Sequence, residues 1–553
     1  MNENEVFGTD PNVYAEGLLE RGFYPENTPP VFSIKHFYQA ALPHLASKEY
    51  LSKKPTEPCS YNASKRGGSR RNFELPNPTF MIDSSIFFSM HRSEVFEHFQ
   101  STDDSLSLPK FQEEGRPARI ASHADFHRLR RQKLATSRYI VRTDISRYFH
   151  SIYTHSLPWA LHGKFESKKD RKVESANIYG NRRDQIVRQS KDGQTIGIPV
   201  GPDFSRYTSE IVGKSIDLKF REKFGDQCTI IRHVDDFFIG ADNLDEANNL
   251  LTGLRDAIRH YQLDINETKT SIVGTNLDLE PFWPVKIRRE IEGFVGQNPK
   301  GKGSTAGHDF VYFLDEVVRI ANSQADDGVV KYALRKMDEN ELWSDYWHLV
   351  ESFLVRSAVN FPHCWDYVAR IASWRHLTHG INKELWSDVV SKSLLRTAAA
   401  GNDSEVCWSL WLAKQAGLSV DLHAHELILE KCGAMSALLA LDVFHSKPVQ
   451  FKYPKAKLLE RVGDRPFGGE NWLLGYEADR LFDYKLKTKN LNGFHLVEEL
   501  YAKDVEFYDV EAVQDVFLGV DDFSDVASAL EGITSYYDTE YDGAEDDEVD
   551  PLF

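Results

Sequence analysis

Apolar residues follow one pattern before residue 290 and another after residue 308. In the first part, short apolar runs alternate with amphipathic stretches, which is typical of strands and helices built around one sheet. From residue 308 to 448, helical patterns follow one another with short connections. The pattern predicts an α+β fold with a mixed sheet, helices on one face of it, and an all-α part behind it. Strands are expected at 139–145, at 269–273 and, as a hairpin, within 229–240, with helices at 203–220 and 245–260.

The segments before residue 139 and around residue 150 give weaker signals. Residues 1–60 hold two short helical signals joined by a proline-bearing loop, and they are expected to pack on the next domain. Ser60 to Arg71 is polar, basic and glycine-bearing, so it reads as a mobile loop, which could close over a phosphate chain or be disordered. Residues 80–88 suggest a strand and then a helix, and residues 146–161 suggest one helix.

A short sequence recurs in the helical half. Glu341-Leu342-Trp343-Ser344-Asp345 returns as Glu384-Leu385-Trp386-Ser387-Asp388, at a spacing within the range of HEAT and armadillo repeats. One recurring pentapeptide also fits chance, so the all-helical character is the firmer expectation.

Composition fits a folded protein of a reducing compartment. At 553 residues the chain is too long for one ordinary core, so two or three domains are expected, and its hydrophobic fraction of 41% is that of a folded protein. The five cysteines are scattered and contain no CxxC pair, so we expect neither a disulfide framework nor a zinc site. We see no signal peptide and no long uncharged apolar run. A cytoplasmic protein without a membrane partner is therefore expected.

The distribution of charge changes what the net charge suggests. The formal net charge of −18 disfavours a nucleic-acid partner on its face. However, basic stretches lie at 116–147 and 164–191, whereas much of the acid gathers at 538–550. Salt screens charges over about 10 Å, so a local basic surface can hold phosphates whatever the total charge. The charge map allows a polyanion on the N-terminal half only.

Three aspartates are the candidates for chemistry. Asp235 and Asp236 fall at the tip of the expected hairpin, where a solvated turn is the commoner fate of such a pair. Asp144 ends another expected strand, and adjacent strands would bring the three acids together. Such hard oxygen ligands suit Mg²⁺, and two Mg²⁺ ions can activate an attacking hydroxyl and stabilise a leaving pyrophosphate. The set predicts nucleotidyl transfer.

Four ordered motifs resemble the palm of reverse transcriptases. The likeness covers roughly residues 60–290, and the basic stretch 116–142 is similar to the fingers segment. His233 stands where that family usually has another aromatic residue. The loop without glutamine at 198–202 and the long helical C-terminus look most like the bacterial abortive-infection (Abi) and unknown-group (UG, DRT) defence reverse transcriptases. The motifs are Thr143-Asp144-Ile145-Ser146-Arg147-Tyr148-Phe149, Gly197-Ile198-Pro199-Val200-Gly201-Pro202, His233-Val234-Asp235-Asp236 and Leu263-Asp264-Ile265-Asn266-Glu267-Thr268-Lys269-Thr270.

The resemblance implies roles for individual residues. Asp144, Asp235 and Asp236 would be catalytic and, with Ile145, would form a site for two Mg²⁺ ions, with Mn²⁺ as an alternative. Phe149 would block a ribose 2′-hydroxyl and favour dNTPs, and Lys269 matches a position proposed to protonate pyrophosphate. Taken singly, the cations also fit solvated surface positions, and Phe149 fits a core. The residues implied in nucleotide binding are Arg130, Lys133, Arg142, Ser146, Arg147, Tyr148, Phe149, Gly201, Pro202 and Lys269.

The resemblance also implies a domain plan. It has an N-terminal helical extension (1–59), reverse-transcriptase fingers and palm (60–290), a HEAT-like helical repeat domain (291–530) and an acidic tail (531–553). We see no RNase H domain, no nuclease motif and no clear thumb signal after Pro284. The helical domain would then stand in place of the thumb.

The implied activity is that of an antiphage-defence RNA-directed DNA polymerase, a DNA nucleotidyltransferase. In relatives of this type, DNA synthesis needs no external template, starts from a protein tyrosine and releases single-stranded DNA from a homo-oligomer. Tyr536, Tyr537 and Tyr541 are conceivable primers, although their acidic surroundings also fit a solvated tail. Three alternatives stay open: copying of a dedicated non-coding RNA, a nucleotide cyclase, which would not need long basic fingers, and an idle palm that binds a protein partner through its helical repeats.

Overall fold

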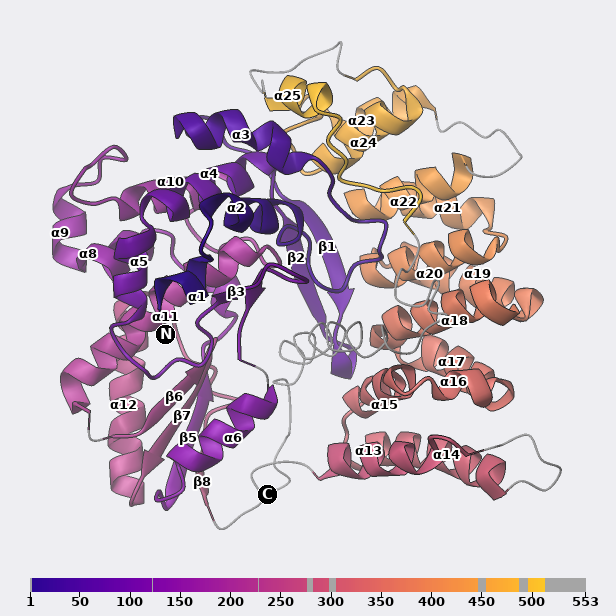
Figure 1. The fold of residues 1–553 in the computed structure, drawn as a ribbon, viewed down its shortest axis with the longest axis horizontal. Helices are drawn as coiled ribbons and strands as arrows, with labels where there is room; N and C mark the ends of the chain where they lie inside the picture. The colour runs from indigo at the N-terminus through magenta and orange to yellow at the C-terminus, as the bar shows by residue number, and fades with distance from the viewer. Residues whose placement is uncertain are drawn as a thin grey trace.

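The computed structural model describes residues 2–121, 123–226, 228–275, 282–297, 305–445, 454–486 and 496–512. Its fold is α+β, as predicted. The first part of the chain forms a small sheet surrounded by helices, and the part after residue 282 forms a column of helices beside it (Figure 1). A two-stranded hairpin, β1–β2, lies between these two parts (Figure 1).

The central sheet has the strand order β6-β7-β5-β8. All three of its strand pairs are antiparallel, so the prediction of a mixed sheet was wrong. The tight turn at Val234-Asp235 joins β6 directly to β7 and makes that pair antiparallel, as the expected hairpin required. The pairs β5–β7 and β5–β8 join segments that are distant in the sequence, and they are antiparallel as well, which the order of the elements did not reveal. The strands are β5 (Tyr139–Asp144), β6 (Ile230–His233), β7 (Asp236–Ala241) and β8 (Ser271–Gly274).

Helices cover both faces of this sheet. On one face lie α11 (Asp203–Phe224) and α12 (Leu244–His260), whose apolar residues join those of Val141, Phe237 and Ile239 in the main core. On the other face, α6 (His123–Lys133) packs Phe126 against Ile231 and Phe238 in a smaller core. The expectation of helices on one face only was therefore wrong. Because the sequence of α6 is very polar, it gave no indication that one aromatic ring, that of Phe126, packs the helix against the sheet.

The segment 59–75 is an antiparallel hairpin rather than a mobile loop. Strands β1 (Cys59–Ser64) and β2 (Arg70–Leu75) flank the short 3₁₀ turn Arg66–Gly68. Cys59, Tyr61 and Ala63 alternate inward and are buried. Asn62, Ser64 and Arg70 find partners on the helical column instead of water, and for this reason composition alone suggested a loop.

The N-terminal part also differs from expectation in detail. It has three helices rather than two: α1 (Glu3–Phe7), α2 (Pro11–Glu20) and α3 (Phe37–Ser47). Their aromatic rings pack into the main core, where Phe7 stacks on Tyr207 of α11. Residues 80–88, expected as a strand and a helix, lie within one buried helix, α4 (Pro78–Met90), which Asn77 caps. An almost wholly buried helix has no polar face, so its periodicity could not be read from sequence.

Residues 146–161 form two short helices, not one. The chain leaves helical geometry after α7 because Tyr153 bridges to Ile196 and Thr154 N–H donates to Thr195 O at 2.8 Å. The remaining elements of this part are α5 (Arg92–Phe99), β3 (Lys110–Phe111), β4 (Ala118–Arg119), α7 (Tyr148–Ser151), α8 (Ser156–His162), α9 (Lys164–Lys169) and α10 (Gly180–Gln189).

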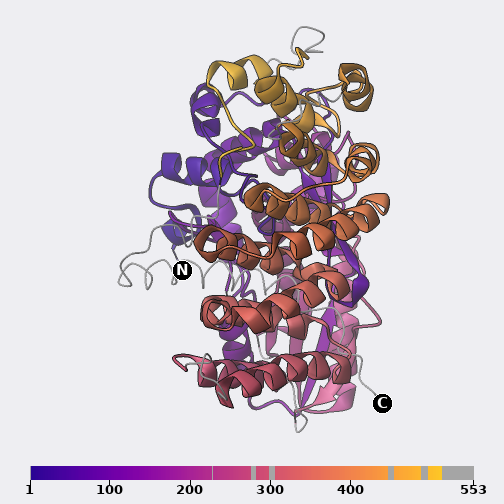
Figure 2. The same cartoon turned by 90° about the vertical axis from the view of Figure 1, so that its right-hand side faces the viewer.

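The C-terminal column is all-helical, as predicted. Seen from the side, its helices are piled in successive layers beside the first part of the chain (Figure 2). The described helices do not include one that is long and apolar enough to span a bilayer. They are α13 (Trp283–Phe294), α14 (Thr305–Ser323), α15 (Gly328–Glu339), α16 (Leu342–Asp345), α17 (Trp347–Asn360), α18 (Trp365–His379), α19 (Lys383–Ala399), α20 (Asp403–Ala416), α21 (Leu422–Lys431), α22 (Ala434–His445), α23 (Lys455–Val462), α24 (Trp472–Phe482) and α25 (Leu496–Ala502).

The recurring pentapeptide does not mark equivalent positions in the column. Its first copy forms the four-residue helix α16, whereas its second copy lies in the first turns of the long helix α19. Trp343 packs against Trp374, but Trp386 donates a hydrogen bond to Glu351 at 3.0 Å. The recurrence is thus a coincidence of sequence, and a HEAT-like repeat stays a prediction.

The β1–β2 hairpin is tied to the column by polar contacts along its length. Asn62 N–H donates to Asp403 at 3.0 Å, and Arg70 pairs with the buried Glu405 at 2.5 Å. At the tip, Gly67 N–H donates to Asp327 at 2.9 Å. The hairpin therefore bridges the N-terminal ends of α15 and α20.

We predict that Glu405→Gln loosens the hairpin. The variant keeps the shape of the side chain but removes the charge facing Arg70, and a hydrogen bond to a charged group is worth about 1.5–3 kcal/mol. Hydrogen–deuterium exchange of residues 59–64 should quicken, and the thermal midpoint should fall. Glu49→Gln is the matched control, because its pair with Lys53 is exposed, and it should change neither measurement. Unchanged exchange in Glu405→Gln would contradict the bridging role.

Candidate active site

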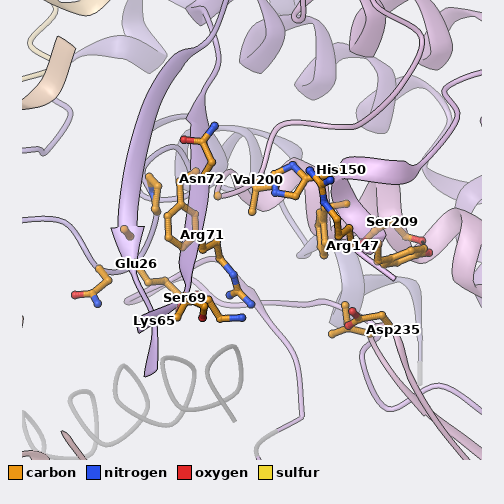
Figure 3. A pocket seen from close by; sticks show the side chains of 18 of the residues that line it. Glu26, Lys65, Ser69, Arg71, Asn72, Arg147, His150, Val200, Ser209 and Asp235 are labelled. Carbon is orange, nitrogen blue, oxygen red and sulfur yellow. Dashed lines mark hydrogen bonds between the residues drawn. The ribbon is translucent and has the colours of Figure 1, made fainter. Parts of the chain in front are cut away.

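One large cavity lies between the central sheet, the β1–β2 hairpin and the helical column. Its volume is ≈ 1030 Å³. The sheet side contributes Asp144, Asp235 and Asp236, and helix α15 contributes Lys331 and Arg335 from the opposite side. Figure 3 shows Arg71 reaching from the hairpin into this space, with Arg147, His150 and Asp235 on the far wall.

Sheet register places two carboxylates side by side. Asp144 is the last residue of β5 and pairs with Asp236, the first residue of β7. Directly paired residues of antiparallel strands project from the same face, and here that face is the one opposite α11 and α12. Asp235 occupies the turn before β7, and its carbonyl accepts the Ile145 N–H at 3.1 Å. The three acids that were expected to come together therefore line one cavity.

The three carboxylates suit a hard divalent cation, but their side chains are not arranged around a common point. Carboxylate oxygens are the ligands that such cations prefer. Within the described residues, however, there is no group of three His, Cys, Asp or Glu side chains already placed to hold a metal. Lys269 Nζ lies 3.3 Å from Asp144 Oδ2 and supplies positive charge there. Among the residues that line the cavity, Asp144, Asp235 and Asp236 could hold such a cation.

The turn between β6 and β7 is strained. Val234 has φ of +55°, a left-handed conformation that is unfavourable for a β-branched residue and costs about 1–3 kcal/mol. Its N–H donates to Ser107 Oγ, and its carbonyl accepts from Arg232 at 3.0 Å. The surrounding structure holds this conformation, and it sets the direction of the Asp235 side chain.

The first-motif residues 145–149 form one wall of the cavity. Arg147 has φ of +49° and precedes α7. Tyr148 turns inward, where its hydroxyl donates to Ser209 O at 2.7 Å, so only its backbone can face a ligand. Phe149 is half-buried and lines the cavity. The rest of this wall is Ile145 and Ser146.

The glycine-proline loop closes another side. Gly201 has φ of +128°, and a Cβ there would lie 2.8 Å from Pro25 Cγ, so the backbone approach requires glycine. Arg116 binds this loop to the N-terminal segment, because it donates to Gly201 O at 2.6 Å and to Tyr24 O at 2.7 Å. Pro202 then precedes the first turn of α11. Both predicted loop residues line the cavity.

Three of the predicted nucleotide-binding cations do not line the cavity. Arg130 and Arg142 stack on Phe238, with guanidinium carbons 4.7 and 5.8 Å from the ring centroid. Phe238 lies on the same sheet face as Asp236, two residues farther along β7, so both arginines are neighbours of the site without forming its wall. Lys133 donates to Asp103 O at 3.2 Å. The predicted primers Tyr536, Tyr537 and Tyr541 lie outside the described residues.

Other cationic side chains line the cavity. Lys65 and Arg71 come from the β1–β2 hairpin, whose basic sequence had suggested a phosphate contact. Neither Arg71 nor Arg147 forms an ion pair with any residue that the structure describes, and Lys191 pairs with Glu74 at 2.8 Å. Lys331 and Arg335 on α15 had no local signal in the sequence, because only tertiary packing brings that helix opposite the sheet.

The pKa of His150 reflects the positive charge on the wall of the cavity that carries Arg147. Burial and then the positive charges of Lys191, Arg147 and Arg71 lower the pKa of His150 to about 4. The folded-state pKa lies below the ordinary value of 6.5, so protonation of His150 opposes folding. Its contribution to stability is complete above pH 6.5 and is lost as pH falls toward 4.

We predict that an anion bound on this wall raises the pKa of His150. Pyrophosphate between Arg71 and Arg147 would cancel part of the positive potential, and the pKa would move up from about 4 toward 6.5. An NMR titration of ¹³C-labelled histidine measures this, and His150→Gln assigns the signal. Arg71→Gln should raise the pKa without pyrophosphate. A pKa that rises in Arg71→Gln but does not move with pyrophosphate would show that no anion binds here.

Residues 91–291 match the family model described as reverse transcriptase (RNA-dependent DNA polymerase), and no curated protein matches the sequence. Apo telomerase from Candida tropicalis is similar over 83% of this chain and 70% of its own, at 12% identity and a TM-score of 0.29. Telomerase from Candida albicans in complex with a TWJ fragment of telomeric RNA is similar over 72% and 65%, at 10% identity and a TM-score of 0.27.

A third solved structure is apo telomerase from Candida tropicalis truncated from the C-terminal domain, with 16% identity and a TM-score of 0.27 over 41% of this chain. This chain spans about half of that one, 52% of its length. TM-scores this low support no conclusion for the present chain. The family match instead coincides with the sheet that carries Asp144, Asp235 and Asp236, and residues 91–291 form a reverse-transcriptase domain.

Proposed function

We propose that this chain is a DNA polymerase of the reverse-transcriptase class that adds deoxynucleotides to a single strand in the described cavity. The observation that carries the proposal is the pairing of Asp144 with Asp236 beside Asp235, within the matched domain. The cations on the facing walls support it, because a triphosphate needs both a metal-binding acid set and positive charge around it.

The residues would share the work as follows. Divalent ions held by Asp144, Asp235 and Asp236, Mg²⁺ by our proposal, would neutralise the triphosphate and assist the attacking hydroxyl. Arg71 and Arg147 would bind its phosphates from opposite walls. Lys269, 3.3 Å from Asp144, would donate a proton to the leaving pyrophosphate. Phe149 would face the sugar and exclude a 2′-hydroxyl.

The enclosure of the cavity favours synthesis without an external template. Helix α15 lies opposite the catalytic acids, and the hairpin tip is bonded to its N-terminal end at Asp327. A space of ≈ 1030 Å³ bounded on these sides suits a nucleotide and a strand end better than a base-paired duplex. The alternative is RNA-templated synthesis on a dedicated non-coding RNA, for which the helical column would have to move.

The biological setting belongs to the proposal as well. An antiphage role, priming from a protein tyrosine and assembly as a homo-oligomer rest on the resemblance to the abortive-infection and unknown-group enzymes. A catalytically idle palm is the competing proposal, in which the column would bind a protein partner. The presence of three adjacent acids in one cavity speaks against it, because unneutralised neighbouring carboxylates are unfavourable.

We predict that Asp235→Asn abolishes DNA synthesis without unfolding the protein. The substitution keeps the size of the side chain and removes a charge that metal ions need, so incorporation should fall at least about 100-fold. The measurement is labelled dNTP incorporation with Mg²⁺, alongside thermal unfolding. Asp242→Asn, at an exposed residue just after β7, is the control and should keep full activity. Persistent synthesis in Asp235→Asn would remove the proposed function.

The same assay separates the modes of synthesis. The purified protein is split, one half is treated with RNase, and the products are run on a denaturing gel before and after proteinase. We expect label that stays with protein until proteolysis and is indifferent to RNase. RNase-sensitive label would instead assign a bound RNA as template, and silence in both halves would favour the idle palm.

We predict that Phe149→Val admits ribonucleotides. The smaller side chain would leave room beside the sugar, and the preference for dNTPs over NTPs should fall at least about tenfold. Competing labelled dNTP and NTP incorporation measures this ratio. Phe73→Val is the control, because Phe73 also lines the cavity but comes from the hairpin wall. An unchanged ratio in Phe149→Val would make Phe149 a packing residue only.

A further inference from the structure

A buried ion cluster lies directly beneath the strained turn. Arg232 precedes this turn on β6, is 0% exposed and projects from the sheet face that packs on α11. Its guanidinium donates to Asp217 at 2.9 Å and to both carboxylate oxygens of Glu210 at 2.8 and 2.9 Å. Asp217 is 0% exposed and Glu210 2% exposed, so none of these charges is solvated.

One donor of this guanidinium reaches the turn itself. Arg232 Nη1 donates to Val234 O at 3.0 Å. Two further bonds hold the peptide groups on either side of this one: Val234 N–H donates to Ser107 Oγ, and Asp235 O accepts from Ile145 N–H at 3.1 Å. The arginine thus completes a set of bonds that keeps Val234 left-handed and directs Asp235 toward the cavity.

Helix α11 is shaped to receive this guanidinium. Glu210, Gly213 and Asp217 follow one another at helical spacing on the face toward β6. A Cβ at Gly213 would lie 2.5 Å from Arg232 Nη1 and 2.6 Å from its central carbon. Gly213 has an ordinary helical conformation, so the glycine is there for space and not for backbone freedom.

Stability alone does not account for such a cluster. Buried ion pairs are often no more stabilising than well-packed apolar residues of similar volume. Lys214 is 2% exposed beside these residues, and its amino group donates to Thr102 O at 2.6 Å. The positive charges of Lys214 and Arg232 balance the two carboxylates. An apolar core could replace the packing, but it could not supply a directional bond to a carbonyl of the turn.

We propose that Arg232, held by Glu210 and Asp217, is a positioning residue that sets the Val234-Asp235 turn for catalysis. It touches no substrate and acts through the Val234 carbonyl. The catalytic part of this inference rests on the proposed polymerase function, whereas its structural part does not. Arg232 would be needed for rate and not for nucleotide binding.

Gly213→Ala tests the proposal without removing a charge. The added methyl group would push the guanidinium away from Val234 O, and a misplacement of about 1 Å can cost on the order of 100-fold in rate. Gly253→Ala on α12 is the matched control, because its Cβ would lie 2.1 Å from the Phe224 ring, away from the turn. Both variants overpack a helix, so both should lower the thermal midpoint.

The measurement that distinguishes the two variants is made at the turn itself. Hydrogen–deuterium exchange of the peptide covering residues 232–236 should quicken in Gly213→Ala but not in Gly253→Ala, and this needs no enzymatic activity. In the polymerase assay, kcat should fall at least about tenfold in Gly213→Ala while KM for dNTP stays within about twofold. Equal exchange and equal kcat in the two variants would overturn the proposal.

A double variant keeps the test sharp if Gly213→Ala folds poorly. Lysine at position 232 keeps the charge but has no planar fork, so it cannot serve both acids and the turn. Adding Gly213→Ala to Arg232→Lys should then change exchange little, because no guanidinium remains to be displaced. Exchange that quickens further when Gly213→Ala is added to Arg232→Lys would overturn the proposal. If exchange of residues 232–236 quickens in Gly213→Ala but the wild-type protein makes no DNA, the proposed polymerase function is wrong. The structural role of Arg232 at the turn would still be supported.

Discussion

The antiparallel pairing of β5 with β7 is the constraint on which the rest of this structure depends. It places Asp144 opposite Asp236 on one sheet face, and the tight turn before β7 adds Asp235. A shift of one residue in this register would send a carboxylate to the face covered by α11. The register is specified because both faces are packed: Val141 and Phe237 lie in the main core, and Ile140 and Phe238 lie under α6.

The helical column forms one side of the cavity. The β1–β2 hairpin carries Arg71 into the cavity and is bonded to the column at its tip, through Asp327, and along β1, through Asp403. Arg71, a cation that lines the cavity, is thereby linked to helices far away in the sequence. The same link encloses the cavity, and a movement of the column would change the space available to a nucleic-acid strand.

The disagreements between expectation and structure share one physical cause. Sequence patterns describe how a segment meets water, whereas Ser60 to Arg71 and the helix α4 meet other protein. The hairpin satisfies its polar groups on Asp403 and Glu405, so its composition resembled that of a loop. Arg130 and Arg142 were expected at the nucleotide because they are cations near the motifs. Instead, Phe238 holds both guanidinium groups by stacking.

By itself, the sequence determined the α+β class, the hairpin that carries Asp235 and Asp236, the strand that ends at Asp144 and the helical second half. These follow from local periodicity and turn chemistry, which need no distant partner. Only the tertiary structure decided the all-antiparallel sheet, the cations at the cavity and the cluster beneath the turn. Each of these depends on contacts between distant segments, as when Arg232 reaches Glu210 and Asp217 across the β6–α11 interface. Packing selects such contacts, and a linear pattern does not encode them.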